Sequence, residues 1–527
     1  MKLLILLLFF ILSHTLYAKN TYWPIYKENE NYLLQSSTLD KDFELSDENV
    51  WNSFLHYGDS LLLSTYPDAA VKSAGTPMQR NTQYSHTQQL LFTANNSQSK
   101  RFLIVVNSSL YSSIQPEIKR YAEDVHAIYG YEVVVETVSQ STSLQLKSLI
   151  LSYQNGLCGV LFVGNLNECM YEIDVDHAGT INATGYRKWP CDLYYMDLDG
   201  VWTDSDNNGI FDQHTGNAAP DVFFGRLSAS GMTSLADETI LIKRQLNKSH
   251  EFWWNSSFHS ANFALNYIYR DWLNTFSSHY LSLVFADHYV DHIADVTGSS
   301  FSKSDYLARF HYPYYGFVHL AAHSSPTSHH FVYQNEYIYT YDITANNYNT
   351  NCMGYNLFCC SACNWLGASS TGFLGGAYLF NQGRTLAVVG STKTGGMKTS
   401  NIFYQKMETN HIGDAFCKWW QQVNGNNVDV SIVSWYYGMA ILGDPTINFR
   451  YKVSDVCSTN LTLSSYPSDN NSNLIMFKAE QSITVNSGFV IPSGVHVIFD
   501  APQIYFSPGF SCQSGASFET RSEGCQL

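Results

Sequence analysis

The chain has 527 residues, of which 45% are hydrophobic, 15% are aromatic and 14% are charged, and its formal net charge is −16. This length exceeds what one hydrophobic core usually supports, so it predicts two to four domains, and the apolar content excludes a disordered chain. The negative charge argues against nucleic acid or an anionic membrane as the partner. The low share of charged residues is typical of an extracellular surface.

The first 18 residues have the pattern of a secretory signal peptide. Lys2 supplies the positive start, residues 3–12 form an apolar run, and Ala18 offers a cleavage point. The apolar run is too short to span a bilayer, which takes about 20 residues, and no later segment is a candidate span. We therefore expect an exported protein, secreted or held at the outer cell surface, with no membrane span. Its eleven cysteines leave at least one thiol unpaired in a monomer.

Residues 19–98, rich in Tyr, Ser and Asn, predict an N-terminal β-rich or irregular region that is a possible pro-segment. Strand and helix patterns then alternate. The apolar run RFLIVV at 101–106 is typical of a strand buried on both faces, and a helical stretch follows that ends at Gly130. A strand at 131–138, a helix at 144–153 and a strand at 156–164 complete a first block. This alternation predicts a parallel sheet flanked by helices.

The same pattern resumes after Arg226 with a helix at 235–250 and a second helix that begins near Asp271. Strands are expected at 263–269, 280–287, 316–322, 355–360 and 385–390, with a glycine-containing helix at 372–383 between the last two. The two blocks either share one sheet or form two sheets side by side. The predicted domains are the signal peptide 1–18, the N-terminal region 19–98, a first α/β subdomain 99–228, a catalytic α/β subdomain 229–452 and a C-terminal module 453–527.

The C-terminal segment repeats itself at an offset of 21 residues. The matched pairs are Gly488/Gly509, Phe489/Phe510 and Gly494/Gly515. Short strands that alternate with glycine turns predict a small all-β repeat module, for which we expect a structural role.

Chemistry in open parallel sheets gathers just beyond the carboxyl ends of the strands. One expected strand delivers His323 into a Ser-rich loop, and another delivers Cys363 at the end of the stretch NLFCCSACNWLG. A Cys–His pair brought together in this way can carry out acyl transfer, with backbone N–H groups stabilising the oxyanion. Spacing alone leaves alternatives open, since Cys363 could equally be a structural thiol.

Two other roles for the cysteines remain possible. Cys360 and Cys363 form a C-x-x-C that could be a redox pair, and Cys352 could join its neighbours in a metal site. Adjacent residues on a strand face opposite ways, so Cys359 and Cys360 could not easily share an ion, and both are expected to be small apolar core residues.

Three further histidines lie near His323. His319 falls inside an apolar run, which predicts a hydrogen-bonded core histidine. His329 and His330 are expected on the surface of a loop.

The stretch DSDNNGIFD predicts a structural calcium site. Asp204, Asp206, Asn208 and Asp212 supply hard oxygen ligands at alternating and terminal positions, and the carbonyl of Ile210 adds another. Position twelve of a full calcium loop would be a bidentate Glu, whereas this chain has Thr215. The alternative is a solvated turn rich in Asp and Asn. No cofactor is expected for catalysis.

Four stretches together resemble the gingipain family of cysteine peptidases, which have a caspase-like α/β fold and are exported by Bacteroidetes-type bacteria. They are DLYYMDLDGVWTDSDNNGIFD with PDVFFGRLSA, then HLAAHSSPT, LFCCSACNWLG and YYGMAILGDPTINF. The resemblance covers roughly residues 100–450, and the C-terminal repeat is similar to β-stack modules on exported proteins of the same bacteria. It implies a caspase-like parallel sheet flanked by helices in two subdomains.

The resemblance also implies roles for individual residues. Cys363 would be the nucleophile, His323 the general acid/base, and Asp271 the acid that orients it. The backbone N–H groups of Ser324 and Cys363 would stabilise the oxyanion, although the family usually has Gly where this chain has Ser324, which can crowd the substrate. Substrates would be proteins or peptides. The rival expectation is a non-catalytic scaffold associated with the cell surface or the secretion machinery.

Overall fold

The structure is a computed structural model, and it describes residues 84–93, 100–173, 175–176, 180–181, 187–259, 263–276, 281, 284, 289–296, 301–311, 315–345, 351–398, 400–423, 436–467 and 472–527. The predicted signal peptide, residues 1–18, and most of the N-terminal region 19–98 lie outside the described residues.

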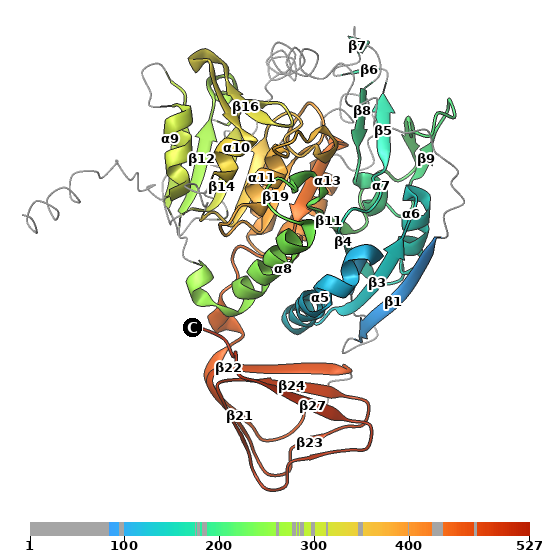
Figure 1. The fold of residues 1–527 in the computed structure, drawn as a ribbon, viewed down its shortest axis with the longest axis vertical. Coiled ribbons are helices and arrows are strands. Elements are labelled where there is room, and N and C mark those ends of the chain that lie inside the picture. The colour runs from blue at the N-terminus through green and yellow to red at the C-terminus, as the bar shows by residue number, and fades with distance from the viewer. Residues whose placement is uncertain are drawn as a thin grey trace, which may run out of the picture.

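One eleven-stranded sheet runs through both predicted α/β subdomains (Figure 1). Its spatial order is β1-β3-β2-β4-β11-β20-β19-β18-β14-β12-β13. From the β1 edge to the β13 edge, the strands are β1 (Ser85–Phe92), β3 (Glu132–Ser139), β2 (Arg101–Asn107), β4 (Leu157–Val163), β11 (Phe223–Leu227), β20 (Met439–Gly443), β19 (Ala387–Ser391), β18 (Gly354–Phe358), β14 (Tyr315–Ala321), β12 (Phe263–Ile268) and β13 (Tyr289–Ala294). The two blocks therefore share one sheet.

Most neighbouring strands of this sheet are parallel, as the strand–helix alternation predicts. The exceptions are β1, which pairs antiparallel with β3 at one edge, and β20, which runs antiparallel to β19. Central strands such as β4, β11, β14 and β18 are buried almost throughout their length. That burial explains why they appear in the sequence as continuous apolar runs rather than alternating ones.

Helices cover the two faces of the sheet (Figure 1). They are α5 (Ser108–Tyr129), α6 (Ser143–Ser152), α7 (Leu193–Met196), α8 (Glu238–Trp254), α9 (Lys303–Ala308), α10 (Thr340–Thr344), α11 (Leu374–Phe380), α12 (Ser400–Met407) and α13 (Ile412–Val423). Helix α5 ends where the sequence predicts, because Gly130 adopts a left-handed conformation with φ of 65° and its N–H caps the His126 carbonyl. Within the described residues, no helix has both the length and the apolar character that a membrane span requires.

One predicted element of the second block was wrong, and another lies mostly outside the described residues. The helix expected near Asp271 is a single 3₁₀ turn, η3 (Arg270–Trp272). The strand expected at 280–287 falls mostly outside the described residues, and the outer partner of β12 is β13 at 289–294. Leu281 and Val284, the described residues of the expected strand, lie outside any strand.

Smaller sheets and 3₁₀ turns connect the strands and helices of the large sheet. They comprise β5 (Met170–Ile173) with β8 (Arg187–Pro190), β6 (Val175–Asp176) with β7 (Thr180–Ile181), β9 (Val201–Thr203) with β10 (Gln213–Thr215), and the three-stranded β15 (His323–Ser324), β16 (Ser328–Phe331), β17 (Glu336–Tyr339). Further 3₁₀ turns are η1 (Ser230–Met232), η2 (Ser256–His259), η5 (Arg309–His311), η6 (Val332–Gln334), η7 (Trp365–Gly367) and η8 (Val453–Asp455).

The C-terminal module is a stack of parallel strands with its own core. Its strands are β21 (Ser458–Leu463), β22 (Leu474–Val485), β23 (Val490–Ile491), β24 (His496–Asp500), β25 (Gln503–Phe506), β26 (Ser511–Cys512) and β27 (Ser517–Arg521). Val490 pairs with Ser511 and His496 with Ser517, each at the 21-residue offset of the sequence repeat. The predicted all-β repeat is therefore confirmed. The repeated glycines have positive φ, from 80° to 101°, which explains their spacing.

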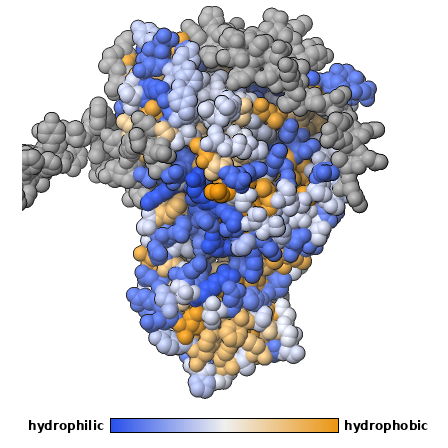
Figure 2. All heavy atoms as spheres, in the orientation of Figure 1, coloured by the Kyte–Doolittle hydropathy of each residue, from blue (hydrophilic) through white to orange (hydrophobic). Residues whose placement is uncertain are grey.

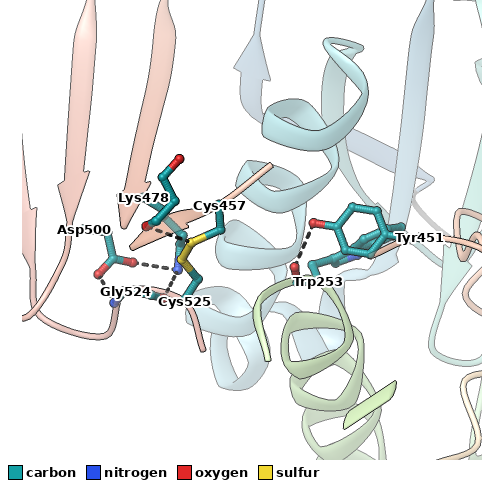
Figure 3. Close-up of a disulfide and its surroundings, with 8 residues drawn as sticks. Trp253, Tyr451, Cys457, Lys478, Asp500, Gly524 and Cys525 are labelled. Atoms are coloured by element: carbon teal, nitrogen blue, oxygen red, sulfur yellow. Dashed lines mark hydrogen bonds and ion pairs between the residues drawn. A yellow bond between two sulfur atoms is a disulfide. The ribbon is translucent and has the colours of Figure 1, made fainter. Parts of the chain in front are cut away.

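A disulfide and several ion pairs hold this module. Cys457 is bonded to Cys525, 68 residues further along the chain, and the buried Lys478 ammonium lies 2.7 Å from Asp500 (Figure 3). Arg521 of the module pairs at 2.9 Å with Glu123 of α5. Figure 2 shows hydrophobic spheres over the far end of the module, whose exposed large apolar side chains include Phe506 and Phe518.

Candidate active site

Three neighbouring strands deliver the candidate site residues to one edge of the sheet. β12, β14 and β18 are parallel, and Ala321 of β14 pairs with Ile268 on one side and Phe358 on the other. Backbone bonds continue beyond the strands, since Tyr269 N–H donates to the Ala321 carbonyl at 2.9 Å and Ala322 N–H to the Phe358 carbonyl at 3.3 Å. Residues that follow these strands therefore stay close together.

His323 and Asp271 meet at this edge. The Nε2 atom of His323 lies 2.8 Å from Oδ2 of Asp271, which belongs to the η3 turn that follows β12. His323 is buried against the rings of Tyr269 and Trp272, at centroid distances of 5.7 and 5.4 Å, whereas the Asp271 side chain is 27% exposed. A carboxylate in this position fixes the orientation of the imidazole.

Residues 359–363 form a tight turn at the end of β18. Ser361 has a positive φ of 54°, and its N–H donates to the Lys393 carbonyl at 2.7 Å. The Gly375 N–H of α11 donates to the Ala362 carbonyl at 2.7 Å. The turn is therefore attached to α11 and to the residues that follow β19.

The thiol of Cys363 points toward α11 and β19. A methyl group placed on Gly390 of β19 would lie 2.7 Å from its Sγ, and one on Gly375 of α11 would lie 3.0 Å from it. Cys363 is buried, and that burial raises the pKa of its thiol above the usual range. Cys363 as nucleophile stays a prediction.

The expected oxyanion donor at Cys363 is engaged elsewhere. Its backbone N–H donates to the carbonyl of Ser391 at 2.9 Å, because the turn brings this residue onto the end of β19. The role of this N–H as an oxyanion donor stays a prediction.

Ser324 links the His323 loop to the cysteine turn. Its hydroxyl donates to the carbonyl of Cys360, and Ser324 is buried. The side chain that replaces the expected Gly is therefore held against the neighbouring loop. Its backbone N–H as an oxyanion donor stays a prediction.

Cys359 and Cys360 are both fully buried, as the sequence predicts. The Cys359 thiol donates to the Leu320 carbonyl of β14 at 3.7 Å, and its burial raises its pKa well above the usual range. Cys359 is therefore a core thiol.

The other histidines of this region are buried, and His319 and His329 have side-chain hydrogen-bond partners. His319 Nδ1 lies 2.6 Å from the Tyr404 hydroxyl, which confirms a core histidine. The surface position expected for His329 and His330 was wrong, because both lie on β16, which is buried between β15 and β17. His329 Nε2 lies 3.0 Å from the Tyr378 hydroxyl of α11.

Burial of these histidines makes stability depend on pH. It lowers the pKa of His319 and of His329 to about 3, so between pH 6.5 and 3 the unfolded chain binds protons that the folded chain does not. We expect the free energy of unfolding to fall as the pH falls through this range, by about 1.4 kcal/mol per pH unit for each histidine. Urea unfolding of the wild type and of His329→Gln at pH 7, 6 and 5 measures this slope. Equal slopes in the two proteins would contradict it.

A residue that the sequence did not single out connects the first block to this site. Arg226 of β11 is buried, and its Nη2 donates to Asp192 at 2.6 Å and its Nη1 to the Leu166 carbonyl at 3.0 Å. Its guanidinium carbon lies 4.7 Å from the ring centroid of Trp365, two residues beyond Cys363. Arg226 lies in the GRL stretch of the sequence, but only the fold shows which residues it contacts.

The residues proposed to bind calcium form a compact exposed loop. Asp204 accepts bonds from the N–H groups of Asn208 and Gly209, at 3.1 and 2.7 Å, and Asp212 accepts one from Ser205 at 3.0 Å. The Ile210 N–H donates to the Asn208 side chain at 2.8 Å. These bonds are those of a turn rich in Asp and Asn.

Glu172 and a separate group of three aspartates also bear on the calcium prediction. The buried Glu172, remote in sequence, accepts a bond from the Asn208 amide. Among the described residues, the acidic oxygens that converge within 4.8 Å are those of Asp197, Asp199 and Asp221, outside the predicted set. Calcium at 204–212 stays a prediction.

The comparison with protein families decides the class of the protein. The model of peptidase family C25 matches residues 95–450. The chain belongs to peptidase family C25. This is the gingipain family of cysteine peptidases, so the resemblance found in the sequence is confirmed. The match spans the large sheet from just before β2 to just after β20, and the C-terminal module lies beyond it.

Comparisons with individual proteins add less. No curated protein matches the chain. A solved structure described as that of a protease superposes with a TM-score of 0.44 and 12% identity, over 67% of this chain and 79% of its own. At that level of similarity it carries no argument about this C25 protein.

Proposed function

We propose that this C25 protein is an exported endopeptidase that hydrolyses peptide bonds in proteins through a Cys/His dyad. His323 would act as general acid/base, Asp271 would orient it, and the thiol would come from the turn at 359–363, where the family resemblance assigns Cys363. The observation that carries the proposal is the 2.8 Å contact between His323 and Asp271 at the strand edge that also presents the cysteine turn.

The proposed reaction follows the general scheme of a thiol peptidase. The imidazole takes the thiol proton, and the sulfur attacks the carbonyl carbon of the scissile bond. The imidazolium then protonates the leaving amine as the C–N bond breaks, and water hydrolyses the thioester. Backbone N–H groups near the two loops, with Ser324 as the first candidate, would stabilise the oxyanion.

One observation favours the rival function, a non-catalytic scaffold. His323 and the cysteines of the turn are all buried, whereas a working dyad has to admit a peptide. The scaffold would keep the C25 fold for surface or secretion-associated interactions and would not cleave substrates.

Hydrolysis of a mixed peptide library by the purified mature chain tests the proposal. We expect cleavage that iodoacetamide abolishes, and the products would define the side chain preferred at the cut. A folded protein that cleaves no peptide, and whose cysteines of the turn resist iodoacetamide, would favour the scaffold. Export is tested separately, by finding the full chain processed near Ala18 outside the cytoplasm.

We also propose that the loop at 204–212 binds a structural calcium ion. If it does, saturating Ca²⁺ raises the melting temperature over that in EGTA, with about 2.7 kcal/mol of stabilisation at a hundredfold excess over the Kd. Asp206→Asn should abolish this shift, whereas Asp199→Asn, a control in the neighbouring acidic group, should keep it. Loss of the shift only in Asp199→Asn would move the ion to that group, and equal melting temperatures in the wild type would contradict calcium binding.

A further inference from the structure

We propose that two copies of this chain associate through the end of the C-terminal module, with the last coil of one copy stacked on the last coil of the other. The inference goes beyond the proposed peptidase function and does not depend on it. It concerns the strands β25, β26 and β27, which together form the end face of the module in the part of the chain that the structure describes.

The module is built as a triangular coil of parallel strands, in which each coil rests on the one before it (Figure 1). β25 pairs with β22, β26 with β23 and β27 with β24, all in parallel register. Backbone bonds join the coils between these strands as well, since the Ser511 N–H donates to the Phe489 carbonyl at 3.1 Å. Each coil therefore covers the core of the preceding coil and bonds to its backbone.

The end face exposes positions that are core positions in the coil before it. The register matches residues of the two coils in the pairs Val485/Phe506, Ile491/Cys512 and Val497/Phe518. The first member of each pair is fully buried. The second member is exposed, by 37% for Phe506 and by 42% for Phe518, and Cys512 is an exposed free thiol. Terminal coils of repeat proteins normally have a polar outer face, so this end leaves the core of the module open.

The end face combines a hollow, aromatic rings and strand edges. A hollow of about 470 Å³ is lined in part by Ile504, Phe506 and Thr520. The ring of Phe510 lies 4.6 Å from that of Phe506 and 5.1 Å from that of Phe518, between centroids, so the apolar surface is continuous. Among the described strands, β25, β26 and β27 each pair on one side only. An apolar surface with open strand edges is a template for a further strand layer.

The module itself shows which shape fits this face. In the inner coils, the layer that covers the core is another coil of the same repeat. Within the described part of the module, the opposite end is closed, because Leu463 of β21 and Ile475 of β22 are buried and Tyr466 packs against the core. The open coil that a second copy presents is therefore its own end face. Two identical faces that meet in this way form a closed dimer with a twofold axis.

Charge also favours this face as the contact between copies. The chain has a formal net charge of −16, so most of the surfaces of two copies repel each other. β25 and β26 contain no charged residue. The charged residues of β27 are Glu519 and Arg521, which form an ion pair with each other at 2.8 Å. Two end faces can therefore approach without unpaired like charges between them.

Sedimentation velocity of the full chain over a range of micromolar concentrations tests the association. Every sample carries Cys512→Ser, so that a disulfide through this exposed thiol cannot produce a dimer. We expect the monomer to convert into a dimer as the concentration rises, and Phe506→Glu/Phe518→Glu to stay monomeric. The matched control is Leu144→Glu, which places a charge on an exposed leucine of α6 and should keep the dimer. A chain that is monomeric throughout, or a dimer that both variants keep or both lose, overturns the inference.

Maleimide labelling of the wild type covers the case in which the two glutamates unfold the module. The rate of labelling at Cys512 is mapped by mass spectrometry at several protein concentrations. We expect this rate to fall as the concentration rises, because the dimer covers the thiol. A rate that does not depend on concentration overturns the inference. If that constant rate is also slow, the end face is covered within a single chain.

Discussion

His323→Ala is expected to lower kcat/KM for peptide hydrolysis by about 10³-fold, within the range that removal of a general acid/base usually costs. The loss follows from two tasks of the imidazole, which are to take the thiol proton and to protonate the leaving amine. Both depend on a ring that Asp271 holds at 2.8 Å. The measurement is the initial rate of cleavage of a library-derived peptide, with the melting temperature measured in parallel.

The matched control is His319→Gln, four residues earlier on β14. His319 is equally buried, but its ring contacts the Tyr404 hydroxyl of α12 rather than Asp271, and it has no place in the proposed chemistry. We expect His319→Gln to change stability more than activity. Wild-type rates in His323→Ala, with the protein folded, would contradict the dyad whichever thiol is the nucleophile.

The layers of the fold could be predicted from the sequence, because buried parallel strands are continuous apolar runs. RFLIVV at 101–106 and the run at 156–164 became β2 and β4, and the strands that carry His323 and the cysteines were found within two residues. The run at 280–287 falls mostly outside the described residues, and its described Leu281 and Val284 are not in a strand. The partner of β12 is the more polar β13.

Parts of the candidate site depended on information that local patterns lack. The sequence predicted that His323 and a cysteine would follow neighbouring strands. Spacing left the role of Cys363 open, and the resemblance of its Ala-Cys-Asn stretch to the family motif implied that it is the nucleophile. Where each cysteine of the turn at 359–363 lies depends on the register of β14 against β18 and on the turn at Ser361. His329 and His330 were misplaced for a similar reason, since only the fold shows β15 and β17 on either side of them.

The double variant Cys457→Ser/Cys525→Ser is expected to destabilise the C-terminal module by about 4 kcal/mol. The disulfide closes a loop of 68 residues, and most of its effect in the chain-entropy description comes from restricting the unfolded module. Its second cysteine lies two residues from the chain end, next to Gly524, whose N–H donates to Asp500 at 2.7 Å and whose carbonyl accepts from Lys478 (Figure 3). Loss of the bond therefore also loosens the partners of a buried ion pair.

We expect any peptide cleavage by the C25 unit to change less, because the disulfide lies outside residues 95–450, although Cys457 and Cys525 also pack in the core of that unit. Denaturant unfolding monitored by proteolysis of the module, together with the cleavage rate of the peptide substrate, separates the two effects.

The control is Cys512→Ser, which changes an exposed cysteine of the same module that is outside the disulfide. If the double variant unfolds at the same denaturant concentration as Cys512→Ser, the ion pairs of Lys478 and Arg521 hold the module without the disulfide. If peptide cleavage falls together with module stability, the module and the C25 unit unfold as one cooperative body.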